Sequence, residues 1–498
     1  MLRREFLSAT AAVAALLPAR RLFAAQLAQL EKAGGELLAK TLSGGETVLR
    51  AADVEALATK VRGALVLPGQ PAYDSARHVW NGMYDKRPAL IARCSGAADV
   101  REAVNFAREH QLLTAVRGGG HSFSGKSTCD GGIVIDLSSF DAVTVDPLAR
   151  TARVDGGALL GQLDHETRAF GLATTAGTVS HTGAAGLTLG GGFGRLCRHY
   201  GLACDNLRSV DVVTADGRFL RASDSENPDL FWGLRGGGGN FGVATSFEYR
   251  LHPMNPIILG GEIGWPADQM AEAFRFYVDF TKTAPDELNI DAFAVTPPGA
   301  TPMFIVEACW SADHARGEQV LAPLRAFGKP AFDKIGPMEY VKIQQGADAI
   351  NAIGQRYYAK SAFLPELSAG MQENLREAFL AAPAGRRYDI IMSDVSGAVA
   401  RVAPDATAFP NRGGRYWLAL MAIWTDPAED EGRIAVVREA WKPIEPHTDG
   451  FYTNLISDVS DAKIRSNYGR NYDRLVTVKT KYDPTNQFRL NANVLPKS

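Results

Sequence analysis

The chain contains few cysteines, and their number and spacing exclude several small, cross-linked folds. There are five cysteines in 498 residues, and no two of them form a C-x-x-C pair. Disulfide frameworks and the common zinc sites both need paired, closely spaced cysteines. We therefore expect no metal site. The chain must be stabilised by hydrophobic cores, and its length allows two or three domains.

The chain also lacks an excess of charge of either sign and, after its N-terminus, any long apolar run. Its formal net charge is −2, and no run of Lys or Arg marks a surface for nucleic acid. Apolar residues make up 46% of the chain and charged residues 22%, as in ordinary globular proteins. No later stretch reaches the length of a transmembrane helix. We expect neither nucleic-acid binding nor stable membrane insertion.

The N-terminus shows, in order, the features of a twin-arginine export signal. Arg3-Arg4 precedes Glu5-Phe6-Leu7, and an alanine-rich apolar run follows over residues 9–17. This run is too short to span a bilayer. An ordinary amphipathic N-terminus is the alternative. The order of features predicts a signal peptide over residues 1–25, export in the folded state by the twin-arginine machinery, and a periplasmic or extracellular protein.

Glycine, in contrast, is abundant and clustered. The chain has 50 glycines, and three clusters lie at 117–125, 183–194 and 233–242. Consecutive glycines let the backbone turn sharply and present N–H groups to an anion. In a long chain with regular apolar patterning, such clusters indicate ligand-binding loops rather than disorder.

The first cluster, TAVRGGGHSFSG, has the composition of a loop that binds a diphosphate. Its glycines offer N–H groups, and Arg117 adds a fixed cation. His121 stands at the edge of the loop, where its side chain could reach the group that the diphosphate carries. The alternative is that His121 is an ordinary loop residue. The anion-binding residues predicted here are Arg117, Gly118, Gly119, Gly120, His121 and Ser122.

The third cluster contains a G-x-G-x-x-G match, at Gly237, Gly239 and Gly242, that resembles a dinucleotide-binding fingerprint. That fingerprint needs a strand before it and a helix after it. The residues after Gly242 alternate between apolar and polar over 243–251, which predicts a strand. We therefore exclude an NAD site of the Rossmann type.

The pattern of apolar residues predicts an α+β protein in several parts. Strands and helices alternate up to two prolines at 253 and 256; beyond them the glycine clusters stop and aromatic residues become frequent. We divide the chain into a signal peptide at 1–25, a helical lead-in at 26–75, a ligand-binding domain at 76–255, a substrate domain at 256–455 and a C-terminal segment at 456–498.

Several motifs together resemble one family. The R-x-G-G-H-S loop at 117–122, the G-N-F-G-V stretch at 239–243 and the tail NYGRNYDRLVTVKTKYDPTNQFRLNANVLP at 467–496 occur in the expected order. The chain resembles FAD-linked oxidases with a PCMH or vanillyl-alcohol-oxidase type of FAD domain, in particular the berberine-bridge-enzyme-like branch. The resemblance implies a two-subdomain FAD-binding domain, a substrate domain of antiparallel sheet and helices, and a berberine-bridge segment that returns to the FAD domain.

The resemblance also implies how FAD is held. In that family the His of the first loop bonds to the 8α methyl of the flavin, and His121 is the matching residue. Many members carry a second bond from a cysteine, but Val179 stands at that position, so we expect a single covalent bond. Further cofactor-binding residues expected from the motifs are Gly177, Thr178, Val179, Gly183, Gly186, Gly191, Asn206, Gly242, Val243, Asn491 and Asn493.

The activity implied is the oxidation of a small molecule. A flavin accepts hydride from a CH–OH or CH–N donor, such as a carbohydrate, an alcohol or a secondary metabolite. Dioxygen is the acceptor expected first. A dehydrogenase that uses a quinone or protein acceptor is one alternative, and a flavin-binding protein without turnover is another.

The catalytic residues expected from the resemblance lie near the end of the substrate domain. Tyr452 and Asn454, with Asp458, match an element in which the Tyr abstracts the substrate hydroxyl proton. A buried phenol needs a depressed pKa for this role, from a nearby cation or carboxylate network. The alternative is that Tyr452 is a packing residue. His181 is a further candidate, for substrate contact or for bracing its loop, and Lys360 and Tyr416 are weaker candidates.

Overall fold

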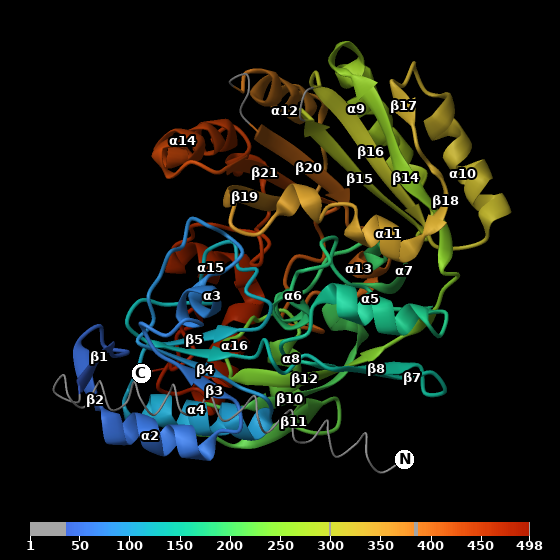
Figure 1. Cartoon of the computed structure of the whole chain (residues 1–498). Coiled ribbons are helices and arrows are strands. Elements are labelled where there is room, and N and C mark those ends of the chain that lie inside the picture. Colours follow the sequence, from blue (N-terminus) through green and yellow to red (C-terminus); the bar gives the residue numbers. More distant parts are fainter. Residues whose placement is uncertain (1–35, 298–299, 383–386, 498) are drawn as a thin grey trace, which may run out of the picture.

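The computed structural model describes residues 36–297, 300–382 and 387–497, and these form two modules that meet across a broad interface (Figure 1). We call residues 36–255 the N-terminal module and residues 257–447 the sheet module. The expected signal peptide and residues 26–35 lie outside the described residues. No helix within the described ranges is long and apolar enough to cross a membrane.

A four-stranded sheet forms the first half of the N-terminal module. Its strand order is β3 (Ala64–Val66), β4 (Leu90–Arg93), β6 (Ile133–Asp136) and β5 (Thr114–Arg117), and only β3 runs antiparallel to its neighbour. Helices α2 (Ala51–Lys60) and α4 (Ala97–Glu109) lie beneath this sheet (Figure 1). The apolar residues of α4 that recur at helical spacing are buried, as that spacing predicts.

The prediction that residues 26–75 form a helical lead-in is wrong for the part that the structure describes. β1 (Glu36–Lys40) and β2 (Glu46–Arg50) form an antiparallel hairpin, and β3 belongs to the four-stranded sheet. Only α2 and α3 (Tyr73–Arg77) are regular helices here. The hairpin strands each bury a single residue, Ala39 or Leu49, in the core under the sheet. That sparse pattern gives little periodicity to detect in the sequence.

A five-stranded antiparallel sheet forms the second half of the N-terminal module. Its order is β11 (Phe219–Ser223), β10 (Leu207–Val213), β12 (Val243–Arg250), β8 (Thr151–Asp155) and β7 (Val143–Asp146). Helices α5 (Leu160–Arg168) and α8 (Pro228–Leu234) pack near it. Because β12 begins directly after Gly242, the G-x-G-x-x-G stretch does not open a helix, which confirms the exclusion of a Rossmann site.

The sheet module contains a large antiparallel sheet. The order is β17 (Phe332–Asp333), β14 (Ile257–Pro266), β16 (Met303–Trp310), β15 (Leu288–Val295), β20 (Arg387–Asp394), β21 (Tyr416–Trp424) and β19 (Arg356–Leu364), and β18 (Gly336–Glu339) also pairs with β14. Helices α9 (Met270–Thr283), α10 (His314–Ala326), α12 (Ala369–Leu380) and α14 (Asp430–Trp441) lie on its outer side (Figure 1). The opposite face is turned toward the N-terminal module. The sequence patterns did not predict β14 or β19.

The C-terminal segment returns to the N-terminal module, as expected. Helices α15 (Asp461–Tyr468) and α16 (Tyr472–Tyr482) lie beside that module in Figure 1. The Lys479 ammonium and the Asp483 carboxylate are fully buried and 2.6 Å apart. Lys479 also donates to the carbonyl of Asn240, at 2.8 Å, and the side chain of Asn240 accepts from the N–H of Val494, at 2.9 Å. The third glycine cluster is thereby held by the tail.

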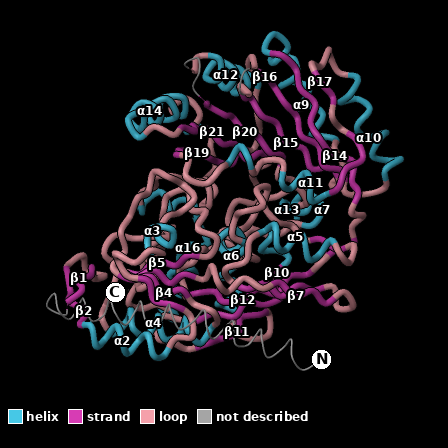
Figure 2. Tube along the Cα trace, viewed as in Figure 1, coloured by secondary structure: helices cyan, strands magenta, loops and turns pink. Residues whose placement is uncertain are grey.

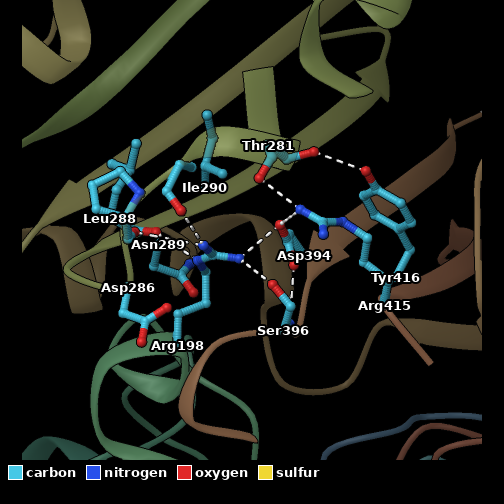
Figure 3. A network of polar contacts seen from close by, with 12 residues as sticks. Arg198, Thr281, Asp286, Leu288, Asn289, Ile290, Asp394, Ser396, Arg415 and Tyr416 are labelled. Atoms are coloured by element: carbon cyan, nitrogen blue, oxygen red, sulfur yellow. Dashed lines mark hydrogen bonds and ion pairs between the residues drawn. The ribbon is translucent and has the colours of Figure 1, made fainter. Parts of the chain in front are cut away.

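A buried ion-pair network holds the two modules together. Arg198, in α7 (Cys197–Tyr200) of the N-terminal module, is 2% exposed and reaches into the sheet module (Figure 3). Its guanidinium lies 2.6 Å from Asp394 and donates to the carbonyl of Leu288 at 2.8 Å. Arg415 approaches the same carboxylate, at 3.0 Å. Two cations therefore share one fully buried carboxylate, a geometry that ties α7 to the ends of β15, β20 and β21.

Candidate active site

A cavity of about 920 Å³ lies between the two modules. Loops predominate in the chain trace of this region (Figure 2). All three glycine clusters and the inner face of the large sheet line it. The predicted site residues found in its lining are Gly118, Gly119, Gly120, His121, Ser122, Gly177, Thr178, Val179, Gly183, Gly186, Gly242, Tyr452, Asn454 and Asn491. Segments far apart in the sequence therefore meet at one site.

The first and second glycine clusters meet backbone against backbone. A Cβ atom on Gly119 would lie 2.5 Å from the Cα of Gly183, and one on Gly118 would lie 2.9 Å from the carbonyl oxygen of Gly156. Real side chains do not tolerate such approaches, so only glycine fits at these positions. The two loops consequently form one continuous wall of the cavity, with little side-chain bulk to exclude a ligand.

His121 lies in that wall with its ring fixed by an aromatic stack. The imidazole stacks on the indole of Trp80 at 4.0 Å between centroids, and Trp80 stacks on Tyr357 of β19 at 3.8 Å. Burial, together with the nearby His181, lowers the pKa of His121 to about 3, so the ring is neutral at physiological pH. Its Nε2 atom is buried and has no partner among the described residues. Sequence reasoning missed Trp80 and Tyr357, because neither belongs to a motif.

His181 lies beside His121 but outside the cavity lining. The two ring centroids are 5.1 Å apart, and the His181 Nε2 atom is also buried without a partner in the described chain. Its loop is held by the sheet module, because the N–H of Ser180 donates to Asp348 at 2.7 Å. This placement fits bracing of the His121 loop better than direct contact with a substrate.

Arg117 does not face the cavity, contrary to the expectation that it would supply a cation there. Its guanidinium lies behind Gly120, donates to the carbonyl of Ala76 and is 3.9 Å from Asp136. Thr114 and Val116 of β5 line the cavity, so the alternation of the strand directs Arg117 to the face away from the cavity. The cation that lines this part of the cavity is Lys126, whose ammonium is 2.6 Å from the carbonyl of Asn491.

Four other predicted residues also lie outside the lining. Asn206 donates to the carbonyls of Tyr200 and Leu202, at 3.0 and 2.9 Å, and so braces the loop after the second cluster. The others are Gly191, which lies under the ring of Phe409, Val243, which is buried in β12, and Asn493, whose Oδ1 atom is buried without a partner in the described chain.

Tyr452 lines the cavity, but its pKa is not depressed. Its hydroxyl oxygen accepts from the N–H of Gly192 at 3.2 Å and from the amide of Asn454 at 2.9 Å. Burial raises the pKa of Tyr452 to about 12, and these two donors lower it only in part. The carboxylate network expected beside it lies elsewhere, because Asp458 accepts from Tyr358, at 3.0 Å, and from Lys360, at 2.5 Å.

The two weaker candidates are not part of the cavity. Lys360 is committed to Asp458, as its 2.5 Å ion pair shows. Tyr416 projects from the opposite face of β21, where its hydroxyl lies 2.8 Å from the hydroxyl of Thr281 (Figure 3). An alternating strand places successive side chains on opposite faces, so Tyr416 packs under α9 while Trp417 lines the cavity.

The inner face of the large sheet contributes charged groups that sequence reasoning did not identify. Arg195 directly follows the second glycine cluster. Its guanidinium forms a two-point ion pair with the carboxylate of Glu307 in β16, at 2.7 and 3.0 Å. Asp291 of β15 and Glu262 of β14 also line the cavity. Cys197 lies nearby, and burial raises its pKa to about 12, so this thiol stays protonated. The described residues contain no group of three or more His, Cys, Asp or Glu side chains placed so that they could hold a metal ion.

Comparison with known proteins agrees with this architecture. Residues 88–223 match the FAD binding domain family, and residues 461–495 match the family described as berberine and berberine like. The chain is 34% identical over 421 residues to an FAD-linked oxidoreductase of Dictyostelium discoideum, a match that covers 84% of this chain and 91% of the relative. The chain belongs to the FAD-linked oxidoreductases with a berberine-bridge segment.

Two further comparisons extend over nearly the same range. The chain is 32% identical to (R)-6-hydroxynicotine oxidase of Paenarthrobacter nicotinovorans, over 88% of this chain and 97% of the relative. The crystal structure of 6-hydroxy-D-nicotine oxidase from Arthrobacter nicotinovorans superposes with a TM-score of 0.81 at 30% identity, covering 88% of this chain and 98% of that chain. As an FAD-linked oxidoreductase, the protein oxidises a small molecule with FAD as its cofactor.

The residues of the cavity fit FAD. The glycine loops leave room for a large ligand against bare backbone, and Lys126 would supply a cation for its phosphate groups. Buried polar atoms that lack partners in the described chain lie along the cavity wall, including His121 Nε2 and Asn491 Oδ1. Unsatisfied buried polar atoms of this kind are costly unless a ligand or water completes their hydrogen bonds. When bound, FAD supplies the two-electron acceptor of the reaction.

Proposed function

We propose that this protein is an exported oxidase that carries FAD on a single covalent bond to His121 and takes hydride from a CH–OH or CH–N donor. The observation that carries the proposal is the state of His121. Its ring is neutral, stacked on Trp80 and directed from a glycine loop into the lining of the cavity, with Nε2 lacking a partner in the described chain. A neutral imidazole nitrogen is a nucleophile, whereas an imidazolium is not.

A single bond is supported by the residue at the second attachment position and by the state of the nearby thiols. Val179 lines the cavity at the position where related enzymes carry a cysteine. The thiols of Cys197 and Cys204 are buried, and burial raises the pKa of both well above its usual range. Neutral thiols react slowly compared with thiolates.

Acid precipitation of the purified holoprotein tests the covalent bond. The yellow colour should stay in the pellet, and mass analysis should find flavin on one peptide, which spans His121. The His121→Ala variant should release its flavin to the supernatant, whereas His181→Ala, a matched change of the neighbouring ring, should keep it in the pellet. Flavin lost wholly to the supernatant from the wild type, or found on a Cys197 or Cys204 peptide, would contradict the proposal.

We propose dioxygen as the electron acceptor. Support comes from the relative named (R)-6-hydroxynicotine oxidase, which aligns over nearly its full length. An oxidase should form hydrogen peroxide in step with donor consumption in air-saturated buffer. Turnover only with an added quinone or protein acceptor would favour the dehydrogenase alternative.

Export by the twin-arginine route rests on the sequence of residues 1–25. Replacing Arg3-Arg4 with two lysines should retain the folded, yellow protein in the cytoplasm of a bacterial host. Arg20-Arg21 offers a matched control, because these residues are also paired but follow the apolar run. Cell fractionation with a flavin assay measures the distribution. Equal export of both variants would rule out the twin-arginine route.

A further inference from the structure

The inner face of the large sheet carries a row of side chains that the proposed function has not used. Register places Glu262 opposite Glu307, Glu307 opposite Asp291, Asp291 opposite Ser393 and Ser393 opposite Trp417, across β14, β16, β15, β20 and β21. Residues directly opposite one another in antiparallel strands point to the same face of the sheet. All five side chains line the cavity.

Among the described residues, three neighbouring carboxylates in this row form one ion pair, between Glu307 and Arg195. Side chains directly opposite in a sheet have their Cβ atoms about 5 Å apart, and like charges at that spacing destabilise one another. Arg195 binds Glu307 through both oxygens, whereas Asp291 and Glu262 make no ion pair within the described ranges. Asp291 is nevertheless buried, and its carboxylate accepts only neutral hydrogen bonds, including one from Asn289 at 3.1 Å.

The other end of the row is aromatic. Phe193, Trp417 and Tyr452 all line the cavity; the Phe193 ring lies 4.6 Å from Tyr452 and 6.2 Å from Trp417. Trp417 is 8% exposed, and its indole N–H is buried without a partner in the described chain. Aromatic rings offer a large apolar surface for the carbon skeleton of a ligand. The orphaned N–H independently indicates a ligand that carries a hydrogen-bond acceptor.

The neighbouring row of the same face is apolar. Phe293 lies opposite Ile305 and Ile391, and all three line the cavity. A polyol such as a carbohydrate would lose hydration against this row without gaining hydrogen bonds. An organic cation with an apolar skeleton can pair its charge with the carboxylate row and pack its skeleton against the apolar row.

We infer that the donor is an amine that is cationic at neutral pH, with its ammonium group at Asp291 and its carbon skeleton against Phe193, Trp417 and Tyr452. This inference rests on the proposed function, because it names the substrate class of the same cavity. The bound cation supplies the positive charge that the carboxylate row lacks. Arg195 fixes Glu307, and thereby keeps the position beside Asp291 open for the ligand.

A pair of probes with the same shape and different charge tests the inference. Phenyltrimethylammonium is a permanent cation, and tert-butylbenzene is its neutral analogue. Calorimetric titration of the flavin-loaded wild type should show the cation binding at least about tenfold more tightly than tert-butylbenzene. Only the cation can form a charge pair with a carboxylate in a desolvated site lined by aromatic rings. Equal affinity for both probes in the wild type would overturn the inference without any variant.

Asp291→Asn keeps the shape of the side chain and removes its charge. It should weaken binding of the cation at least about tenfold and change binding of tert-butylbenzene less than about threefold. The matched control is Asp389→Asn, because Asp389 lines the same cavity but already pairs with Arg387, at 2.8 Å. The control should lose less than about threefold for the cation. Equal losses in both variants would show that Asp291 has no specific role.

The flavin content of each protein separates failure of this inference from failure of the proposed function. A protein whose flavin is not on His121, but which still selects the cation through Asp291, would contradict the covalent proposal only. A protein with flavin on His121 that is reduced by neutral alcohols and shows no preference for the cation would contradict the substrate class only.

Discussion

Replacing Asp394 with asparagine should lower the free energy of unfolding by about 3–5 kcal/mol, the cost of removing one partner from a buried ion pair. Asp394 is fully buried and lies within 3.0 Å of the guanidinium groups of Arg198 and Arg415. An asparagine fits the same space but leaves the buried Arg198 and the partly exposed Arg415 without a counter-charge. Because Arg198 comes from the N-terminal module, the loss should weaken the attachment of the two modules (Figure 3).

Urea unfolding followed by tryptophan fluorescence measures this change. Asp286→Asn is the matched control, because Asp286 lies in the same region and pairs with Arg401 at the surface, where both side chains are at least one-third exposed. Surface pairs of this kind contribute about 0–1 kcal/mol. If Asp394→Asn and Asp286→Asn lost the same stability, the buried network would not hold the modules together.

Replacing Tyr452 with phenylalanine should slow reduction of the flavin at least about tenfold, and up to about ten-thousand-fold if the phenol acts as a general base. The change keeps the ring against Phe193 and removes only the hydroxyl, which accepts from Gly192 and Asn454. Since burial raises the pKa of Tyr452 to about 12, the hydroxyl is protonated near neutral pH. In that state we expect it to act first as a hydrogen-bonding group that orients the donor.

Anaerobic stopped-flow reduction by one donor, compared between wild type and variant, measures this effect. Tyr416→Phe is a suitable control, because it removes a buried hydroxyl from the same sheet on the face away from the cavity. Tyr452→Phe should retain covalent flavin in the acid pellet, so a lower rate cannot be attributed to lost cofactor. Equal reduction rates would make Tyr452 a packing residue.

The glycine loops could be predicted from sequence because their chemistry is local. Only glycine fits where Gly119 meets Gly183, and a run of glycines exposes its N–H groups whatever the rest of the chain does. The strand after Gly242 could be predicted for the same reason, since alternation is a property of neighbouring residues. The motifs of the berberine-bridge tail predicted that it returns to the N-terminal module. Hydrogen bonds of Asn240 with Lys479 and Val494 hold it there.

The direction of individual side chains could not be predicted in this way. Arg117 belongs to the loop motif, yet its guanidinium turns toward Ala76 and Asp136 behind the loop, because β5 places it on that side. Lys126, which no motif marks, takes the position in the lining. Asp458 follows Tyr452 closely in sequence but binds Lys360 of β19, since the edge strand offers it a cation.

The sequence by itself determined the fold class, the FAD-linked family and the three loops that surround the cavity, because these depend on local backbone freedom and on motifs that are continuous in the chain. Only the tertiary structure decided that Trp80 stacks on His121 and that Glu262, Glu307, Asp291, Ser393 and Trp417 form one row. The physical reason is strand pairing. The order β14, β16, β15, β20 and β21 and its register arise from contacts between distant segments, and a register shift of one residue would turn every one of these side chains to the opposite face.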